Sequence, residues 1–289
     1  MTSTEIDPSQ YSIPGRSRGL LDVFRRYYLL RLLVRKGVST RYRNSALGWI
    51  WSYTKPLSQY VIYFFIMGVI LGNTRNIENF AVYLLAGIIA VNFFNEAFGN
   101  ATTSITGNSA LVRKIYLPRE LFPVSAVIVA FIHFLPQLVV LLVVALLSGW
   151  VPTWMTLLAG AVGMLIIVGL ASGLGLIFGA INVLFRDAQN FVEIIKMFAV
   201  WTAPVMYSWE KVADALPNWA AQLYMMNPLA TAVELFHRAF WYTDDKAEVM
   251  QLAPHIVENT LIAVVVIAVV LAIGQLVFRK IEPRFAQEL

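Results

Sequence analysis

The sequence of 289 residues contains no cysteine, and charged residues make up only 13% of it. Without cysteine, the chain has no disulfide bond, no thiolate nucleophile and no cysteine ligand for a metal. A soluble domain has roughly a quarter of its residues charged, whereas 58% of this chain is hydrophobic. The composition therefore predicts an all-α polytopic membrane protein.

Short motifs of several enzyme classes are also missing. The sequence has no GxxxxGK[ST] loop, so we do not expect it to hydrolyse ATP by a P-loop, and it has neither HExxH nor GxSxG. Its three histidines, His133, His237 and His255, are too scattered to predict a metal cluster. We expect no cofactor or metal on this chain. The net charge of +5 does not indicate nucleic-acid binding, because the basic residues flank hydrophobic stretches.

Six hydrophobic stretches have about the ~20 residues that cross a bilayer. They lie at about 56–71, 80–98, 122–147, 154–183, 191–207 and 260–278. With both termini in the cytoplasm, only four of the 22 Lys and Arg residues remain outside: Arg75, Lys211, Arg238 and Lys246. Because basic residues concentrate in cytoplasmic loops, this distribution predicts six transmembrane helices with both ends inside.

The N-terminal region has two parts. Residues 1–19 are polar and contain Pro8, Pro14 and Gly15, which predicts a flexible segment, and they lack the apolar core of a signal peptide. Residues 20–43 mix leucines and aromatics with arginines, which predicts an amphipathic helix in the headgroup plane, in contact with membrane lipids. A merely positive flank of the first span is the alternative. We treat residues 20–289 as a single domain.

A basic connector, residues 107–123, joins the second and third predicted spans. It contains Arg113, Lys114 and Arg119, and its pattern predicts a short amphipathic helix over Ser109–Ile115 that stops before Pro118. The connector either docks a soluble partner or is a solvated loop whose cations only set the topology.

The outer connector, residues 208–259, is predicted to contain short helices. Asn227 and Pro228 have the pattern of an N-cap and first helical residue. After them, apolar residues at Leu229, Val233, Phe236 and Phe240 share one helix face. The connector also contains three tryptophans, Trp209, Trp219 and Trp241. They predict that it lies against the outer leaflet or dips into it. The helices either lie over the exit of a pore or form a structural cap.

Ionisable groups inside the spans are few. Glu96, near Asn92 and Asn95, is an acidic residue within the second predicted span, and His133 lies in the third. Such groups are functional candidates because they are costly in lipid. For Glu96 the alternative is a wet vestibule at the cytoplasmic end, and for His133 it is a helix contact.

Two aromatic stripes recur near helical spacing. The first span holds Tyr53, Tyr60, Tyr63 and Phe64, and the fifth holds Phe198 and Trp201, with Tyr207 at its outer end. A tyrosine hydroxyl is costly against lipid without a partner, so these rings are predicted to point inward. They form either helix packing or a track along which sugar rings slide. Gly169, Gly173, Gly175 and Gly179 in the fourth span favour close helix approach, within one chain or between two.

Several stretches together resemble a known family. They are RYRNSALGWIWSYTKP at Arg41–Pro56, then Asn108–Pro123, Phe185–Asp187, Ala203–Tyr207 and Met226–Leu229. In this order they resemble the polysaccharide and polyol-phosphate export permeases, type-2 ABC exporters that include the Wzm-type O-antigen, capsule, teichoic-acid and galactan permeases. One departure is Ala203-Pro204, where the family usually has Ser-Pro, so a role for a hydroxyl there is in doubt.

The resemblance implies a permease that exports a lipid-linked polysaccharide through the inner membrane. It implies a homodimer with two copies of a separate nucleotide-binding ATPase subunit, which would bind ATP and Mg²⁺. It implies a coupling helix near residues 104–114 that docks the ATPase, with contacts or supports from Asn108, Leu111, Arg113, Lys114, Tyr116 and Glu120. Spans one and five, which carry the aromatic stripes, would border the export path.

Two rival functions remain at this point. A type-2 ABC exporter of a small drug or lipid would have the same architecture, with a narrower path lined by bulky aliphatic residues. A membrane-embedded glycosyl or acyl transferase would need acid and base groups that converge on one membrane face. Glu96 and His133 alone do not supply such a set.

Overall fold

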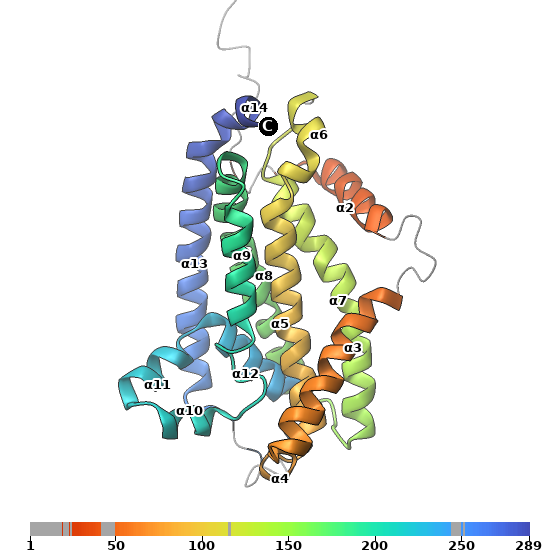
Figure 1. Cartoon of the computed structure of the whole chain (residues 1–289), viewed down its shortest axis with the longest axis vertical. Helices are drawn as coiled ribbons and strands as arrows, with labels where there is room; N and C mark the ends of the chain where they lie inside the picture. The colour runs from red at the N-terminus through yellow and green to blue at the C-terminus, as the bar shows by residue number, and fades with distance from the viewer. Residues whose placement is uncertain are drawn as a thin grey trace, which may run out of the picture.

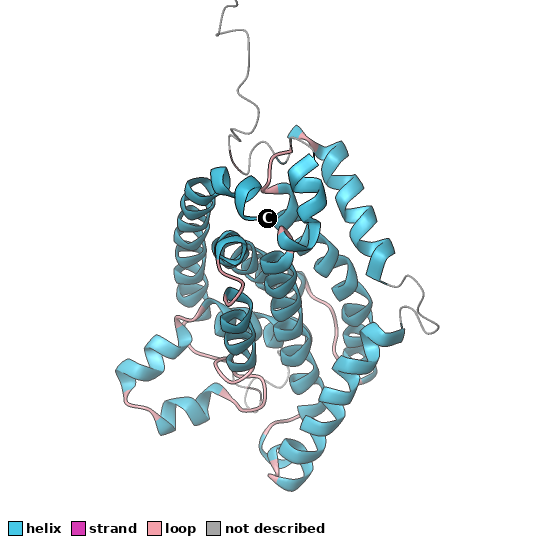
Figure 2. Ribbon diagram, turned by 45° about the horizontal axis from the view of Figure 1, so that its top comes forward, coloured by secondary structure: helices cyan, strands magenta, loops and turns pink. Residues whose placement is uncertain are grey.

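The computed structural model describes residues 19, 23, 25–41, 50–114, 117–243, 250 and 252–289. All regular elements in these ranges are helices (Figures 1 and 2). The main helices are α2 (Tyr27–Arg41), α3 (Trp51–Tyr63), a π-helix (Phe64–Ile70), α4 (Asn73–Asn76), α5 (Phe80–Thr103), α6 (Ser109–Lys114), α7 (Leu121–Leu147), α8 (Trp154–Leu184), α9 (Ala188–Ala199), α10 (Trp209–Ala215), α11 (Asn218–Met225), α12 (Pro228–Phe240), α13 (Ile256–Ile281) and α14 (Phe285–Glu288). Short 3₁₀ turns cover Thr106–Asn108 and Glu282–Arg284.

Four of the described helices are long and apolar enough to cross a membrane. They are α5, α7, α8 and α13, the last continued by the 3₁₀ turn to Arg284. At 1.5 Å per residue, the 24 residues of α5 extend about 36 Å, more than the ~30 Å of a hydrocarbon core. The prediction of an all-α protein that crosses the membrane several times is confirmed.

The first and fifth predicted spans have a different form from these four. Helical backbone begins at Trp51, before the predicted start at residue 56, and passes from α3 into the π-helix, which ends at Ile70. The predicted span over residues 191–207 is helical only as far as Ala199, and turns and bends follow it to Tyr207. Pro204 prevents a continuous helix as far as Tyr207, because proline lacks an N–H and disfavours helix at the preceding residue.

The core of the fold is α5, which packs against α7, α8, α9 and α12 (Figure 1). Most of its side chains from Phe80 to Thr102 are buried. The helix is therefore surrounded by protein along most of its length. It extends from the α4 end of the molecule toward the end that carries the C-terminus (Figure 1).

Glycines of α8 allow two neighbours to approach closely. A Cβ added to Gly175 would lie 2.4 Å from the Cβ of Ala101 in α5, and one added to Gly173 would lie 3.1 Å from the backbone N of Leu271 in α13. The predicted close approach is confirmed, and at these positions the glycines pack helices within one chain.

The outer connector contains an unusual helix, α12. Its predicted start is confirmed, since the Asn227 side chain accepts a hydrogen bond from the N–H of Leu229 at 3.0 Å and Pro228 follows directly. The helix packs against α5, α8 and α13, and Thr231, Glu234 and His237 are buried along with its apolar face. It is therefore inserted among the long helices, whereas α10 and α11 project at the lower left of Figure 1.

At the end that carries the C-terminus, α2 packs across α7. Leu30 is buried in this contact, whereas Tyr27 and Tyr28 are mostly exposed beside exposed arginines. The described part of the predicted helix over residues 20–43 is thus helical and has aromatic and basic side chains on its open face.

Candidate functional site

A cavity of about 750 Å³ opens between α2, α3, α5, α7 and α9. We call it the polar chamber, because five side-chain amides line it: Gln59, Asn92, Asn95, Asn100 and Gln137. These amides come from α3, α5 and α7. Asn92 donates a hydrogen bond to Gln59 at 3.2 Å, and Asn95 donates to the backbone oxygen of Lys196 at 3.3 Å. The second bond joins α5 to α9 across the chamber wall.

Charged side chains of the polar chamber are mostly paired. Arg41, at the end of α2, forms an ion pair with Glu96 in α5. Lys196 of α9 forms a second pair with Glu193 at 2.7 Å, and the exposed Lys55 of α3 completes the set of lining cations. His133 is buried with its Nδ1 4.0 Å from the Glu96 carboxylate. Glu96 is thus a paired carboxylate that lines a polar cavity.

The aromatic stripes lie in different environments. In the first stripe, Tyr53, Tyr60, Tyr63 and Phe64 are half-buried, and Phe64 stacks on Tyr60 and on Phe80 of α5 with ring centroids 6.0 and 6.2 Å apart. In the second, Phe198 and Trp201 are about half exposed on the surface of the single chain. Among the described residues, no ring contact joins the two stripes. The fold therefore places the first stripe partly in helix packing and leaves the second one open.

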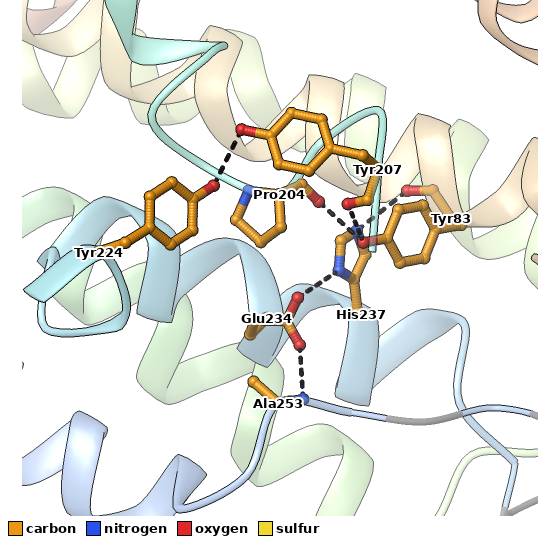
Figure 3. A network of polar contacts seen from close by, with 7 residues as sticks. All are labelled: Tyr83, Pro204, Tyr207, Tyr224, Glu234, His237 and Ala253. Carbon is orange, nitrogen blue, oxygen red and sulfur yellow. Dashed lines mark hydrogen bonds and ion pairs between the residues drawn. The ribbon is translucent and has the colours of Figure 1, made fainter. Parts of the chain in front are cut away.

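Tyr207 belongs to a hydrogen-bonded bend beyond α9 (Figure 3). Its hydroxyl donates to the backbone oxygen of Trp201 at 2.5 Å and lies 3.1 Å from the hydroxyl of Tyr224 in α11. The Tyr83 hydroxyl of α5 lies 2.9 Å from the backbone oxygens of both Pro204 and Tyr207. Burial raises the pKa of the Tyr224 phenol far above its ordinary value, as does the Tyr207 hydrogen bond, so this phenol stays neutral.

A buried histidine and carboxylate extend this network, as Figure 3 shows. In α12, His237 Nδ1 lies 3.4 Å from Glu234 Oε1, and His237 Nε2 lies 3.1 Å from the backbone oxygen of Tyr83. The other Glu234 oxygen accepts the N–H of Ala253 at 3.1 Å. Both side chains are at most 2% exposed, so no substrate reaches them. This pair links α12 to α5 and to the segment that leads into α13. Because it is buried, it cannot be the acid–base site that the transferase alternative requires.

The short helix predicted in the basic connector is present as α6. Its exposed Arg113 and Lys114 end the helix, while Leu111 is half-buried against a small core cluster. Asn108 accepts a hydrogen bond from Lys36 of α2 at 2.7 Å. Glu120 is fully buried and accepts a hydrogen bond from Gln275 of α13 at 3.2 Å. It therefore links the start of α7 to α13 and cannot contact a partner directly. Tyr116 lies outside the described residues.

Residues 28–241 match the sequence model of a family described as ABC-2 type transporter. The chain belongs to this family. Its matched range runs from α2 to just past α12, so it contains the residues that line the polar chamber and all members of the buried network except Ala253. The resemblance to type-2 ABC exporters is thereby confirmed at the level of the family, whose members are membrane permeases.

Curated relatives with established names are moderately similar. The O-antigen export system permease protein RfbA of Klebsiella pneumoniae is 29% identical over 209 residues, which is 71% of this chain and 77% of the relative. The protein of the same name in Myxococcus xanthus is 27% identical over 213 residues, with 74% and 80% covered. The polysialic acid transport protein KpsM of Escherichia coli is 24% identical over 203 residues, with 70% and 77% covered.

Two features of this ABC-2 type transporter escaped sequence reasoning. The partner of Glu96 is Arg41, 55 residues earlier in the chain, and no local pattern connects them. Gln59 and Gln137 line the polar chamber with the asparagines near Glu96, but they lie on other helices. Their only signal in the sequence is an amide within an apolar run.

Proposed function

We propose that this chain is the permease subunit of an ATP-driven exporter that moves a lipid-linked polysaccharide through the inner membrane. The family match carries this proposal, supported by relatives whose names refer to O-antigen export and polysialic acid transport. The polar chamber supports a glycan over the small drug or lipid of the rival exporter. Its walls contain five amides, whereas the rival predicted bulky aliphatic residues.

The proposed topology has six spans and two cytoplasmic termini. Helices α5, α7, α8 and α13 supply four spans. The continuous helix from Trp51 to Ile70 supplies the first, and α9 with the bend after it supplies the fifth. Exposed Arg113, Lys114 and Lys280 lie at the end that carries the C-terminus, which supports a cytoplasmic position for that end.

The proposed complex is a homodimer of this chain with two ATPase subunits, which hold ATP and Mg²⁺. Each ATPase docks on α6, where Arg113 and Lys114 are exposed. Two contacts connect α6 and the polar chamber through α2: the 2.7 Å hydrogen bond from Lys36 to Asn108, and the Arg41–Glu96 ion pair. Movement of the docked ATPase is thus transmitted through a rigid helix to the chamber.

In the proposed mechanism, the lipid-linked end enters sideways between α3 and α9, near the polar chamber. The glycan then passes along aromatic side chains on the first and fifth spans. The lining residues are Tyr53, Tyr60, Tyr63, Phe64, Phe198, Trp201 and Tyr207. The exposed faces of Phe198 and Trp201 are compatible with this role, because a second copy of the chain would enclose them.

The proposed function is tested with purified complexes. The chain is co-expressed with candidate ATPase subunits, isolated by its own tag and assayed for ATP hydrolysis in lipid nanodiscs. Reversal of both charges, Arg113→Glu with Lys114→Glu, is expected to weaken ATPase binding about tenfold or more, equivalent to ~1.4 kcal/mol. Arg75→Glu, an exposed cation at the α4 end, serves as the control and retains binding. A chain that purifies alone, with no ATPase that hydrolyses ATP beside it, refutes the proposal.

A further inference from the structure

The five amides of the polar chamber have much unused hydrogen-bonding capacity. Each carboxamide offers two donors and an acceptor oxygen. With described residues, these five side chains make only the Asn92–Gln59 bond and the Asn95 bond to the Lys196 backbone. The Asn95 Oδ1 atom is buried and has no hydrogen-bond partner in that part of the chain. Because an unsatisfied amide is costly among membrane helices, the arrangement indicates a polar occupant.

The charge of the polar chamber restricts the class of that occupant. Arg41 is paired with Glu96 and Lys196 with Glu193, so these four groups neutralise one another. Lys55 is exposed at the chamber wall and forms no ion pair with any described residue. The chamber thus combines a nearly neutral, amide-rich wall with one available cation. This combination fits a hydroxyl-rich neutral group that is attached to an anion.

The volume and the lining of the polar chamber fit a sugar ring better than a lipid chain. Its volume of about 750 Å³ lies within the ~300–1,000 Å³ of small-molecule sites. Trp51 adds an exposed aromatic ring to the amide-rich wall, and aromatic rings pack well against the C–H faces of sugars. An isoprenoid or acyl chain, in contrast, would leave the amides without hydrogen bonds.

We propose that the polar chamber binds the sugar next to the phosphate-bearing lipid end of the exported molecule. Amides of Gln59, Asn92 and Asn95 hydrogen-bond the sugar hydroxyls, Trp51 packs on the ring, and Lys55 faces the phosphate. This inference rests on the proposed function, and it adds a recognition step before the glycan moves along the aromatic path. The transporter would thus distinguish a loaded lipid carrier from an empty one.

The absence of cysteine allows a direct test, because one introduced thiol is then the only one in the chain. Met197 lines the polar chamber, is exposed and contributes no amide, so Met197→Cys reports on the chamber without altering its amides. Asp214→Cys, on exposed α10, is the matched control outside the chamber. Both variants are reconstituted with the ATPase in nanodiscs and labelled with a water-soluble maleimide. The probes are polyprenyl diphosphate carrying one N-acetylhexosamine, and the same lipid without sugar.

The sugar-bearing lipid is expected to slow labelling of Met197→Cys about tenfold at ten times its Kd, because the thiol reacts only while the chamber is empty. Asp214→Cys is labelled at an unchanged rate. The sugar-free lipid gives little protection, and Gln59→Leu with Asn92→Leu abolishes protection by the sugar-bearing lipid. Equal protection by both lipids refutes sugar recognition, as does no protection by either.

The same samples separate this inference from the proposed function. Glycolipid-stimulated ATP hydrolysis without protection of Met197→Cys would retain the exporter and refute the sugar site. Protection by the sugar-bearing lipid without ATP hydrolysis would retain the sugar site and refute the exporter.

Discussion

Replacing Gly175 with alanine places a methyl group where α8 meets α5. The new Cβ would lie 2.4 Å from the Cβ of Ala101, whereas carbon atoms in contact are about 3.5–4.0 Å apart. The Ala101 methyl group cannot rotate away, so the two helices must separate by more than ~1 Å. Such overpacking costs about 1–3 kcal/mol, and the higher helix propensity of alanine offsets up to ~1 kcal/mol of this.

A net loss of about 1–2 kcal/mol is large enough to measure by thermal unfolding. At about 2–4 °C per kcal/mol for a chain of this size class, Gly175→Ala is expected to lower the midpoint by roughly 2–8 °C. The midpoint is followed in detergent by size-exclusion chromatography of heated samples. Gly107→Ala is the control, because a Cβ added there meets no atom within 4 Å.

Ala101→Gly combined with Gly175→Ala tests the contact itself. Without the Ala101 methyl group, the nearest atom to the new Cβ is the Ala101 Cα at 3.7 Å, an ordinary contact. The double variant is therefore expected to be more stable than the sum of the two single changes predicts. Additive effects, or an unchanged midpoint for Gly175→Ala, would show that α8 and α5 are not in this close contact.

Three further predictions address the buried network, the chamber and the aromatic path. Glu234→Ala removes a buried carboxylate that lies beside His237 and accepts the N–H of Ala253, and it is expected to lower stability by about 2–4 kcal/mol, measured in the same unfolding assay. Arg41→Glu leaves two carboxylates together and is expected to abolish transport in cells, while Arg41→Glu with Glu96→Arg restores part of it; no recovery would refute the ion pair's role. Tyr60→Ala with Trp201→Ala is expected to abolish export without preventing assembly with the ATPase, and unchanged export would refute the aromatic path.

Local chemistry made several elements predictable from the sequence. Long apolar runs predicted the helices that became α5, α7, α8 and α13 within a few residues at most ends. The Asn227-Pro228 pair predicted the start of α12, and the stop before Pro118 predicted the end of α6, because both depend on capping and proline geometry. The small-residue spacing in α8 predicted close helix approach, for which glycine is needed.

Other features depend on contacts between residues far apart in the chain, so they could not be predicted from the sequence. The Tyr83 backbone oxygen lies close to His237, which is 154 positions later in the sequence, and neither residue belongs to a recognisable motif. In the sequence, Glu120 resembles a surface charge of a basic connector, yet it is fully buried and accepts a hydrogen bond from Gln275 of α13. The polar chamber likewise requires five helices to meet, so its amides are recognisable as one group only in the folded chain.

The bend between α9 and α10 has a consequence for how the protein enters the membrane. Alone, α9 extends only about 18 Å, so it cannot cross the bilayer. The bend after it has carbonyl groups without helical hydrogen bonds, and lipid cannot supply hydrogen bonds to them. Three side chains from outside the bend donate hydrogen bonds to its carbonyls: Asn73, Tyr83 and Asn227. Because Asn227 follows the bend in the chain, its hydrogen bond to Thr202 can form only after residue 227 has been synthesised. We therefore expect the bend to take its final form late in the synthesis of the chain.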